Sequence, residues 1–332
     1  MTKLRISCGI PVYNQASTIE QTVLSVLNQQ DLFDEVVIIE NHSTDGTAEV
    51  LKIFGDKIKV ITPPCHNGIA QNWNFCIDRL SNNWFSLLSG DDLLKPGFVG
   101  SVKAAITACP NAALVRTDWD LINGLGDLMH THHQLSVARI TPPPKNWQEQ
   151  LYGPKVSFAA FATRKDLWEQ VGGFPLDFHL FHDWMFWLKL APLGPFIRVP
   201  KSLAQYRVQE RPEIDKNRVA LRLFDEFHYV MDILPKLPWE ISNPDSKIRK
   251  VRAAKLRELL NFLNRYPDLI NNEKCMSKLA AWADSADITE TYQYWLINRQ
   301  PINEKLSRRA ILNIKTIIRK SLILSKLVLY FK

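Results

Sequence analysis

Short apolar runs of strand length alternate with stretches of helical periodicity up to about residue 95. Four such runs lie at residues 4–13, 35–40, 57–62 and 84–88. Continuous apolar runs of this kind are typical of buried parallel strands. Between the runs, apolar residues recur at helical spacing, the first stretch beginning at Ile19. The alternation predicts an α/β fold with a doubly wound, mostly parallel central sheet and right-handed crossovers.

The pattern changes at about residue 210. Before that point we expect further helices and strands at residues 96–108, 112–118, 165–171, 182–190, 196–200 and 202–208. Beyond it the sequence is helical in character, with helices expected at residues 217–234, 246–264, 274–283 and 289–298. We therefore expect a first domain at 1–210, a helical extension at 211–303 and a separate last segment at 304–332.

Cysteine usage and the start of the sequence indicate the cellular compartment, and the charge divides the chain into two parts. The net charge is +7, but residues 1–210 carry −2 and residues 211–332 carry +9. The five cysteines include no Cys-x-x-Cys pair, which argues against a disulfide framework and a zinc site. The chain begins directly with a strand-like segment, and no apolar window of about 18 residues is present. These features predict a cytoplasmic protein.

The last segment, residues 304–332, combines eight Lys or Arg residues and one Glu with many Ile and Leu residues. A basic amphipathic helix of this composition can lie on an anionic membrane surface. The alternative is a helix that packs on its own domain and leaves its basic face in solvent. Nucleic-acid binding is disfavoured, because no recognised module accompanies the charge.

Two adjacent carboxylates, Asp91 and Asp92, follow the apolar run at 84–88 and precede a Pro-Gly turn. Ligands of open α/β sheets lie at the carboxyl ends of strands, and hard divalent cations prefer carboxylate and phosphate oxygens. The pair therefore indicates a metal and phosphate site. The alternative is that both residues only form a turn and cap the next helix.

Two further places carry candidate chemistry. Asp183 opens the apolar helix at 182–190, either as an acid favoured by the helix dipole or as a base beside an apolar pocket. Three histidines, His130, His132 and His133, could bind a metal. A solvated loop is favoured for them, because no carboxylate or Cys stands at a ligand-like spacing.

Seven pieces of the sequence, in order, resemble the family 2 glycosyltransferases over about residues 4–210. They are Ile10-Pro11-Val12-Tyr13-Asn14, the 40–47 loop, Asn67-Gly68-Ile69-Ala70 with Asn74, Ser89-Gly90-Asp91-Asp92 with Pro96, Val171-Gly172-Gly173-Phe174, His182-Asp183, and Leu203 with Tyr206-Arg207. The competing dinucleotide fold is disfavoured, because Gly-x-Gly-x-x-Gly is absent from the first turn.

The resemblance implies a Rossmann-like glycosyltransferase A-type fold, with residues 1–210 as the catalytic domain. It also implies a nucleotide-diphospho-sugar donor, with a UDP-sugar favoured, a divalent metal (Mn²⁺ or Mg²⁺) and inversion at the anomeric carbon. The donor would be bound by Pro11, Tyr13, Asn14, Glu40, Asn41, Asn67, Asn74, Asp91 and Arg207. Asp92 and Asp91 would hold the metal, and Asp183 would deprotonate the acceptor hydroxyl.

The chain departs from the family pattern in several places. Glu40-Asn41-His42-Ser43 replaces the usual Asp-Asp-Gly-Ser, and Ser89 replaces the first acid of Asp-x-Asp-Asp. His182 stands where Glu is often found, and Gln209 where His often follows Tyr-Arg. Fewer negative charges would surround the metal, so we expect a modest metal affinity.

We therefore expect a metal-dependent inverting glycosyltransferase that acts on a saccharide or lipid-linked acceptor. Its setting would be surface polysaccharide or lipopolysaccharide assembly at the inner membrane face. One alternative is a catalytically degenerate sugar-nucleotide-binding or scaffold protein, suggested by Ser89 and Asn41. A nucleotidyltransferase is disfavoured, because no Gly-rich phosphate loop with a basic residue follows the first strand.

Overall fold

The computed structural model divides the chain into two compact units, residues 1–213 and 214–332. In the first unit it describes residues 4–132 and 137–208. In the second unit it describes residues 225, 228–236, 244–265, 276–277, 279–280, 292–293 and 295. Each unit is described by itself.

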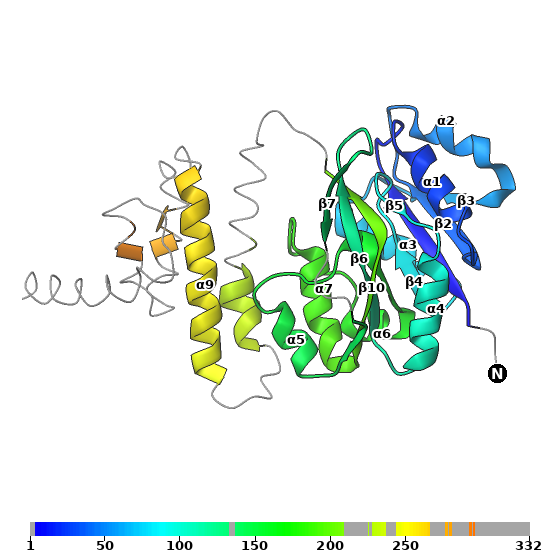
Figure 1. Ribbon diagram of the computed structural model, residues 1–332. Helices are drawn as coiled ribbons and strands as arrows, with labels where there is room; N and C mark the ends of the chain where they lie inside the picture. The colour runs from blue at the N-terminus through cyan, green and yellow to red at the C-terminus, as the bar shows by residue number, and fades with distance from the viewer. Residues whose placement is uncertain are drawn as a thin grey trace, which may run out of the picture. The chain divides into compact units, whose positions relative to one another are not determined.

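The first unit is built around a ten-stranded sheet (Figure 1). Eight strands follow the order β3-β2-β1-β4-β9-β6-β10-β5, and the other two, β7 and β8, pair with β6 and β10. The strands are β1 (Ile6–Val12), β2 (Glu35–Glu40), β3 (Lys59–Ile61), β4 (Trp84–Leu87), β5 (Leu93–Leu94), β6 (Leu114–Ile122), β7 (Leu128–His132), β8 (Arg139–Thr141), β9 (Phe161–Arg164) and β10 (Phe196–Arg207). β1 pairs in parallel with β2 and β4, β2 with β3, and β6 with β10. β9 lies antiparallel between β4 and β6, so β6 points the same way as β4. The predicted α/β fold with a mostly parallel sheet is confirmed.

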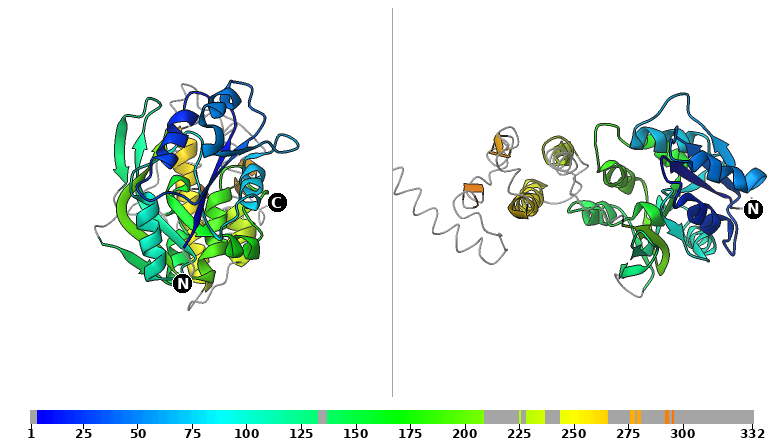
Figure 2. Two further views of the ribbon diagram at one scale, coloured as in Figure 1. Left: turned by 90° about the vertical axis from the view of Figure 1, so that its right-hand side faces the viewer. Right: turned by 90° about the horizontal axis from the view of Figure 1, so that it is seen from above.

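Helices cover both faces of this sheet (Figures 1 and 2). They are α1 (Ile19–Leu27), α2 (Thr47–Leu51), α3 (Ile69–Asp78), α4 (Phe98–Ala108), α5 (Lys145–Gln150), α6 (Lys165–Val171) and α7 (His182–Leu190). Short 3-10 helices lie at Lys52–Lys57, Phe158–Ala160 and Ala191–Leu193. α1 and α4 pack on one face, whereas α3, α6 and α7 pack on the other.

The two faces of β1 show how the alternation of strand side chains builds both cores. Its even-numbered residues, Ile6 to Val12, are buried in the apolar core shared with α1 and α4. On the opposite face, Gly9 lies beneath Cys76 of α3 and Leu87 of β4. A bulkier residue at position 9 would therefore push α3 away from the sheet.

An aromatic cluster fills the face that carries α6 and α7. Phe161 of β9 meets the ring of Trp187 in α7 at a centroid distance of 4.6 Å and that of Phe85 in β4 at 6.4 Å. Phe174, in the turn after α6, lies 6.2 Å from Trp187. All four rings are buried. This cluster fixes the start of α7, where Asp183 lies, to the middle of the sheet.

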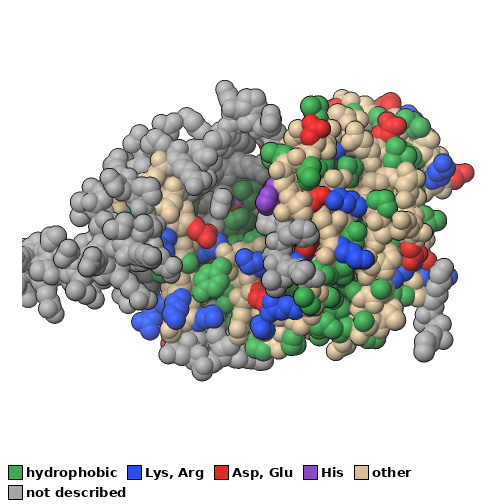
Figure 3. Space-filling model, in the orientation of Figure 1, with side chains coloured by type: hydrophobic (Ala, Val, Ile, Leu, Met, Phe, Trp, Pro, Cys, Tyr) green, Lys and Arg blue, Asp and Glu red, His purple; other side chains and the backbone are tan. Residues whose placement is uncertain are grey.

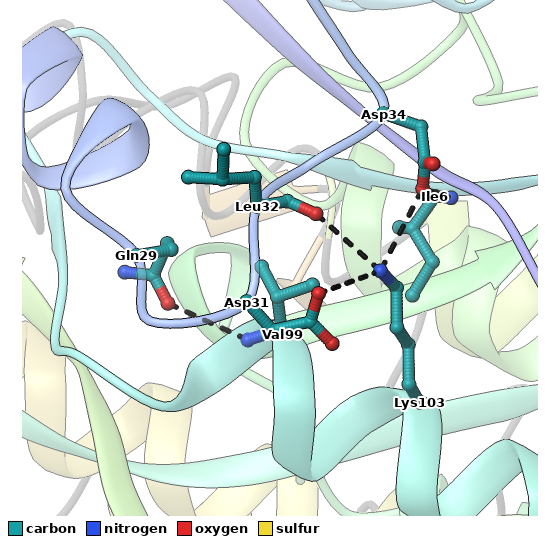
Figure 4. A network of polar contacts seen from close by, with 7 residues as sticks. All are labelled: Ile6, Gln29, Asp31, Leu32, Asp34, Val99 and Lys103. Atoms are coloured by element: carbon teal, nitrogen blue, oxygen red, sulfur yellow. Dashed lines mark hydrogen bonds and ion pairs between the residues drawn. The ribbon is translucent and has the colours of Figure 1, made fainter.

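A polar network ties α4 to the connection between α1 and β2 (Figure 4). Lys103 Nζ lies 3.0 Å from Asp31 Oδ1 and 3.7 Å from Asp34 Oδ2, and it donates to Leu32 O at 3.4 Å. Asp34 in turn accepts a hydrogen bond from the backbone N–H of Ile6 at 3.0 Å. The network therefore anchors α4 beside the first strand.

Several elements differ from the sequence expectation. The runs expected at 196–200 and 202–208 form one strand, β10, whose register shifts between Val199 and Ala204. Between residues 121 and 154, where the sequence pattern predicts no helix or strand, lie β7, β8 and α5. These strands are short, and pairing with β6 and β10 stabilises them more than their own composition does.

The solvated loop predicted around the three histidines is wrong for the two that the structure describes. His130 and His132 belong to β7 and pair with Leu121 and Trp119 of β6. His133 lies outside the described residues. Within residues 4–132 and 137–208 and the described parts of the second unit, no group of three or more His, Cys, Asp or Glu residues could hold a metal ion.

The described part of the second unit is helical, as expected. Its main element, α9 (Pro244–Arg265), buries Leu256, Leu260 and Leu263 at helical spacing, and Trp295 Nε1 donates to Asn264 Oδ1 at 2.9 Å. No described helix is long and apolar enough to cross a membrane. The expected basic helix at 304–332 lies outside the described residues.

A substitution at Gly9 tests the close approach of α3 to the sheet. A Cβ there would lie 2.6 Å from Cys76 Sγ and 2.7 Å from Leu87 Cδ2. We expect Gly9→Ala to lower the free energy of unfolding, measured in urea, by about 1–3 kcal/mol. Gly100→Ala in α4 is the control, because its Cβ meets only Asp31 Cβ at 3.7 Å. It should raise stability by about 0.5 kcal/mol. Equal stability of both variants would contradict this packing.

Candidate functional site

The candidate site lies at the carboxyl ends of β1, β2 and β4. Val12 and Glu40, the last residues of β1 and β2, are register partners, and Leu87 at the end of β4 pairs with Gly9. The chain then passes through Ser89-Gly90 into the two carboxylates at 91 and 92. The parallel strands therefore deliver the predicted polar residues to a single edge of the sheet.

The turn that carries the two carboxylates is packed tightly against the start of α1. Asp92 N donates to Ser89 O at 3.1 Å, and Thr18 Oγ1 donates to Gly90 O at 3.0 Å. A Cβ on Gly90 would overlap Gln15 Oε1 and lie 2.9 Å from Val12 Cγ2. A side chain at position 90 would therefore displace Gln15 and press on Val12, so glycine allows the turn to pack this closely.

Asp92 is the more deeply buried of the two carboxylates, with 1% of its surface exposed. Its Oδ1 accepts a hydrogen bond from Arg207 N at 2.9 Å, and its Oδ2 has no hydrogen-bond partner. Burial, together with the negative charge of Asp91, raises the pKa of Asp92 well above its usual value. The site thus favours either a proton or a cation at this carboxylate.

Arg207 lies beneath the turn and is 4% exposed. Its Nε donates to Asp91 O at 2.7 Å, its Nη1 to Gly124 O at 2.9 Å, and its Nη2 to Gln21 Oε1 at 2.9 Å. A donor contact of Arg207 stays a prediction. The guanidinium binds oxygens of the protein itself, and Arg207 positions the carboxylate turn.

The loops after β1 and β2 are joined by hydrogen bonds. Asn14, at a left-handed φ of 51°, donates its N–H to Ser43 Oγ at 3.0 Å and accepts from Thr44 N through Oδ1 at 2.8 Å. Ala16 N donates to Asp45 Oδ2 at 3.0 Å. The polar sequence of the 40–47 loop thus serves to fix this loop to the first one.

Glu40 and Asn41 are buried beneath these loops and form hydrogen bonds with backbone groups. Glu40 Oε1 accepts from Ser43 N at 2.6 Å, and Glu40 is 6% exposed. The Asn41 side chain bonds the backbone of Asn67 twice: Nδ2 donates to Asn67 O, and Oδ1 accepts from Asn67 N, both at 2.9 Å. Beyond the end of β2, the Asn41 side chain thus bonds the backbone of Asn67 through one donor and one acceptor, as a neighbouring strand would do.

Tyr13 is the exposed aromatic group of this edge. It is 46% exposed, and its ring lies edge-on to His66, with centroids 4.5 Å apart. His66 Nδ1 lies 3.0 Å from Asn41 O, and Pro11 is buried within β1. Six of the predicted donor residues therefore lie together at the ends of the first two strands. They are Pro11, Tyr13, Asn14, Glu40, Asn41 and Asn67.

Asn74 of α3 makes three hydrogen bonds within the protein. Its Nδ2 donates to Phe174 O and its Oδ1 accepts from Phe174 N, both at 2.9 Å, and Oδ1 also accepts from Trp168 Nε1 at 3.2 Å. This side chain holds the turn after α6 against α3. A donor contact of Asn74 stays a prediction beside this structural role.

Asp183 is half-buried in the first turn of α7. Burial raises its pKa to about 6, although its Oδ1 accepts a hydrogen bond from Trp184 N at 2.7 Å. The neighbouring His182 Nδ1 lies 2.7 Å from Pro175 O. A carboxylate with this pKa can accept a proton near neutral pH, as a general base must.

Sequence reasoning missed the residues that support the carboxylate turn. Gln15, Thr18, Gln21 and the 123–124 turn all contact it or Arg207. They are far from residues 89–92 in the sequence and belong to no ligand-like motif. A helix start rich in Gln, Ser and Thr was the available signal.

The carboxylates fit a hard divalent cation in the chemistry of their donor atoms. Asp91 is half-buried, and Asp92 offers a buried Oδ2 without a hydrogen-bond partner. The raised pKa of Asp92 shows that its negative charge is costly there, and a bound cation would offset that cost.

Together the fold and the site define a doubly wound α/β protein with a polar ligand site at the carboxyl edge of its sheet. A solved structure, S. aureus TarS 1-349 in complex with UDP-GlcNAc, is similar with a TM-score of 0.62 and 14% identity. The likeness covers 90% of this chain and 93% of that chain. It confirms the expected glycosyltransferase A-type fold.

The family model described as Glycosyl transferase family 2 matches residues 7–170, most of the first unit. The first unit is therefore identified as a glycosyl transferase family 2 domain, and the match covers just under half of the chain. The matched residues include every element of the candidate site except Asp183 and Arg207.

Two relatives with a similar identity differ in how much of their length the match covers. Protein MT1568 of Mycobacterium tuberculosis is 27% identical over 265 residues, which cover 75% of this chain and 79% of the relative. The chondroitin synthase of Pasteurella multocida is 28% identical over 201 residues, which cover 59% of this chain. That match spans only 20% of the synthase.

Substitution of Arg207 separates its structural role from a ligand contact. We expect Arg207→Met to lower the free energy of unfolding in urea by about 2–3 kcal/mol, because the carbonyls of Asp91 and Gly124 lose a charged donor. Arg207→Lys should restore only part of this, since one ammonium cannot reproduce the planar fork. The control is Lys52→Met on the exposed 3-10 helix. An Arg207→Met protein as stable as the wild type that has lost nucleotide binding would show a ligand contact instead.

Proposed function

We propose that this protein transfers a sugar from a nucleotide-diphospho-sugar donor to an acceptor hydroxyl, with inversion of the anomeric carbon. The observation that carries the proposal is the carboxylate turn at 91–92, fixed by Arg207 at the edge where the loops after β1 and β2 end. Membership of glycosyl transferase family 2 supports the reaction class.

The donor nucleotide is proposed to bind over the joined loops. Tyr13 offers an exposed ring to the base, and Glu40 and Asn41 line the base or ribose side. Pro11, Asn14 and Asn67 shape the same surface. The solved complexes of TarS with UDP-GlcNAc and UDP favour a UDP-sugar here.

Asp91 and Asp92 are proposed to hold a divalent cation, Mn²⁺ or Mg²⁺, at the diphosphate. When bound, the ion would offset the negative charge that grows on the leaving nucleoside diphosphate. The protein contributes the rigid turn: Arg207 holds the Asp91 carbonyl, and Gly90 lets the turn pack against α1. Since Ser89 adds no charge, we propose that metal affinity is modest.

Asp183 is proposed to be the general base. A sugar hydroxyl is a poor nucleophile, and a positioned carboxylate that takes its proton contributes about 10²- to 10⁴-fold in rate. Direct inversion needs a single such base. Burial raises the pKa of Asp183 to about 6, so the carboxylate is ionised at neutral pH and still basic enough to accept the proton.

The acceptor is proposed to be a saccharide or lipid-linked hydroxyl used in surface polysaccharide or lipopolysaccharide assembly. The named relatives include a chondroitin synthase and a hyaluronan synthase of Pasteurella multocida. A lipid-linked acceptor would place the enzyme at the cytoplasmic membrane face, where residues 304–332 could add peripheral contact.

Nucleotide binding tests the donor site. We expect UDP with Mn²⁺ to raise the melting temperature of the wild type more than GDP, CMP or dTDP, and EDTA to abolish the effect. At about 100 times its dissociation constant, a ligand adds roughly 2.7 kcal/mol of apparent stability. Asp91→Asn should lose the shift, whereas the exposed control Asp56→Asn should keep it. A metal-independent shift retained in Asp91→Asn would contradict the proposed metal site.

The pH dependence of turnover tests Asp183. Because its folded pKa is raised to about 6, the carboxylate holds its proton at lower pH, so kcat/KM should fall about tenfold per pH unit below 6. Asp183→Asn should lower kcat about 10²- to 10⁴-fold with donor binding retained. Glu169→Gln on the exposed side of α6 is the control. Unchanged turnover in Asp183→Asn would remove the proposed base.

Absence of turnover with any sugar nucleotide, in a protein that still binds UDP, would favour the scaffold alternative instead.

A further inference from the structure

Three arginines on neighbouring strands of the first unit share one register. Arg198 of β10 is the register partner of Arg116 on β6 and also of Arg139 on β8. Register partners on adjacent strands project from the same face of a sheet. The result is a row of three guanidinium groups across three strands, although like charges placed opposite each other destabilise a sheet.

Two of these arginines are paired with carboxylates. Asp118 accepts from Arg198 Nε at 2.8 Å and from Arg198 Nη2 at 2.6 Å, and both side chains are at most 5% exposed. Glu149 of α5 lies 2.9 Å from Arg139 Nη2. Lys155 adds a fourth cation at the same place. The described residues that line the cleft at this place include four cations and one carboxylate, Glu149.

The row borders a cleft of about 330 Å³. All three arginines, Lys155, Gln148 and Tyr152 line it. Figure 3 shows Lys and Arg side chains around an acidic one over α5. Arg116 is 7% exposed, and its burial and the neighbouring charge of Arg198 lower its pKa to about 10. Residues 1–210 carry a net charge of −2, so this basic cleft is a local concentration of charge and not a general property of the unit.

The cleft is separate from the carboxylate turn. Arg207, which binds Asp92, pairs with Ile122 at the carboxyl end of β6, whereas the row crosses β6 at Arg116. Six residues of strand at about 3.3 Å each place the two about 20 Å apart. A ligand of the cleft is therefore distinct from the proposed donor.

We propose that this cleft is a second ligand site, which binds a phosphate-type anion. Guanidinium groups bind phosphate through paired, charge-assisted hydrogen bonds, and three of them converge here in the lining of one cleft. The volume lies at the small end of ligand pockets, which suits one or two phosphate groups on a small molecule or a lipid headgroup. The exposed pair Arg139 and Glu149 stands at the rim, where an entering anion would exchange with the Glu149 carboxylate for Arg139.

Calorimetric titration of the full chain with pyrophosphate in EDTA tests the proposal. It compares the affinity of variants that lose a positive charge with that of a variant that loses a negative charge. Arg139→Gln should weaken binding about tenfold, since a charge-assisted hydrogen bond is lost. Glu149→Gln should tighten binding about threefold, because it removes the competing carboxylate. Lys52→Gln, which loses one charge elsewhere on the surface, should leave the affinity unchanged.

Two further arms separate this site from the donor site and identify the source of the phosphate. Asp91→Asn should bind pyrophosphate as the wild type does, so the result stands even if the proposed donor site fails. Sedimentation with phosphatidylcholine vesicles, with and without phosphatidate, tests a headgroup ligand. Binding that depends on Arg139 in either arm supports the site. Equal affinity in Arg139→Gln and the wild type in both arms, or no binding in either, would overturn it.

Discussion

The structure of the candidate site depends on one buried guanidinium. Arg207 binds the Asp91 carbonyl, the turn between β6 and β7 and the α1 side chain of Gln21, while its own N–H binds Asp92. Without Arg207, repulsion between the carboxylates of Asp91 and Asp92 would push the two side chains apart. The positive charge and directional donors of Arg207 hold the turn in one place, and the glycine at 90 brings it against α1.

Burial then sets the protonation chemistry of the acids. Desolvation raises the pKa of Asp92 and of Asp183, yet the two groups have different surroundings. Asp92 lies next to another carboxylate, so a cation can relieve its cost, whereas Asp183 starts an apolar helix and can instead take a proton. We propose that this difference assigns one acid to the leaving diphosphate and the other to the acceptor hydroxyl.

The sequence predicted what local patterns determine. The apolar runs placed β1, β2 and β4 correctly, and the acids at the end of β2 and after β4 reach one edge. The short strands β7, β8 and β9 were not predicted, because pairing with distant strands decides them. The contacts of Arg207 within the protein were not predicted for the same reason: its side-chain partners lie 83 to 186 residues away. Asn74 likewise bonds Phe174, 100 residues on.

The most direct test of the central claim is the effect of Mn²⁺ on the ³¹P resonances of UDP bound to the full chain. A metal held by Asp91 and Asp92 at the diphosphate predicts strong paramagnetic broadening of both phosphorus signals in the wild type, which Asp91→Asn loses. Bound UDP whose ³¹P signals Mn²⁺ leaves sharp would contradict it, since the nucleotide and the carboxylate turn would then not meet at a metal.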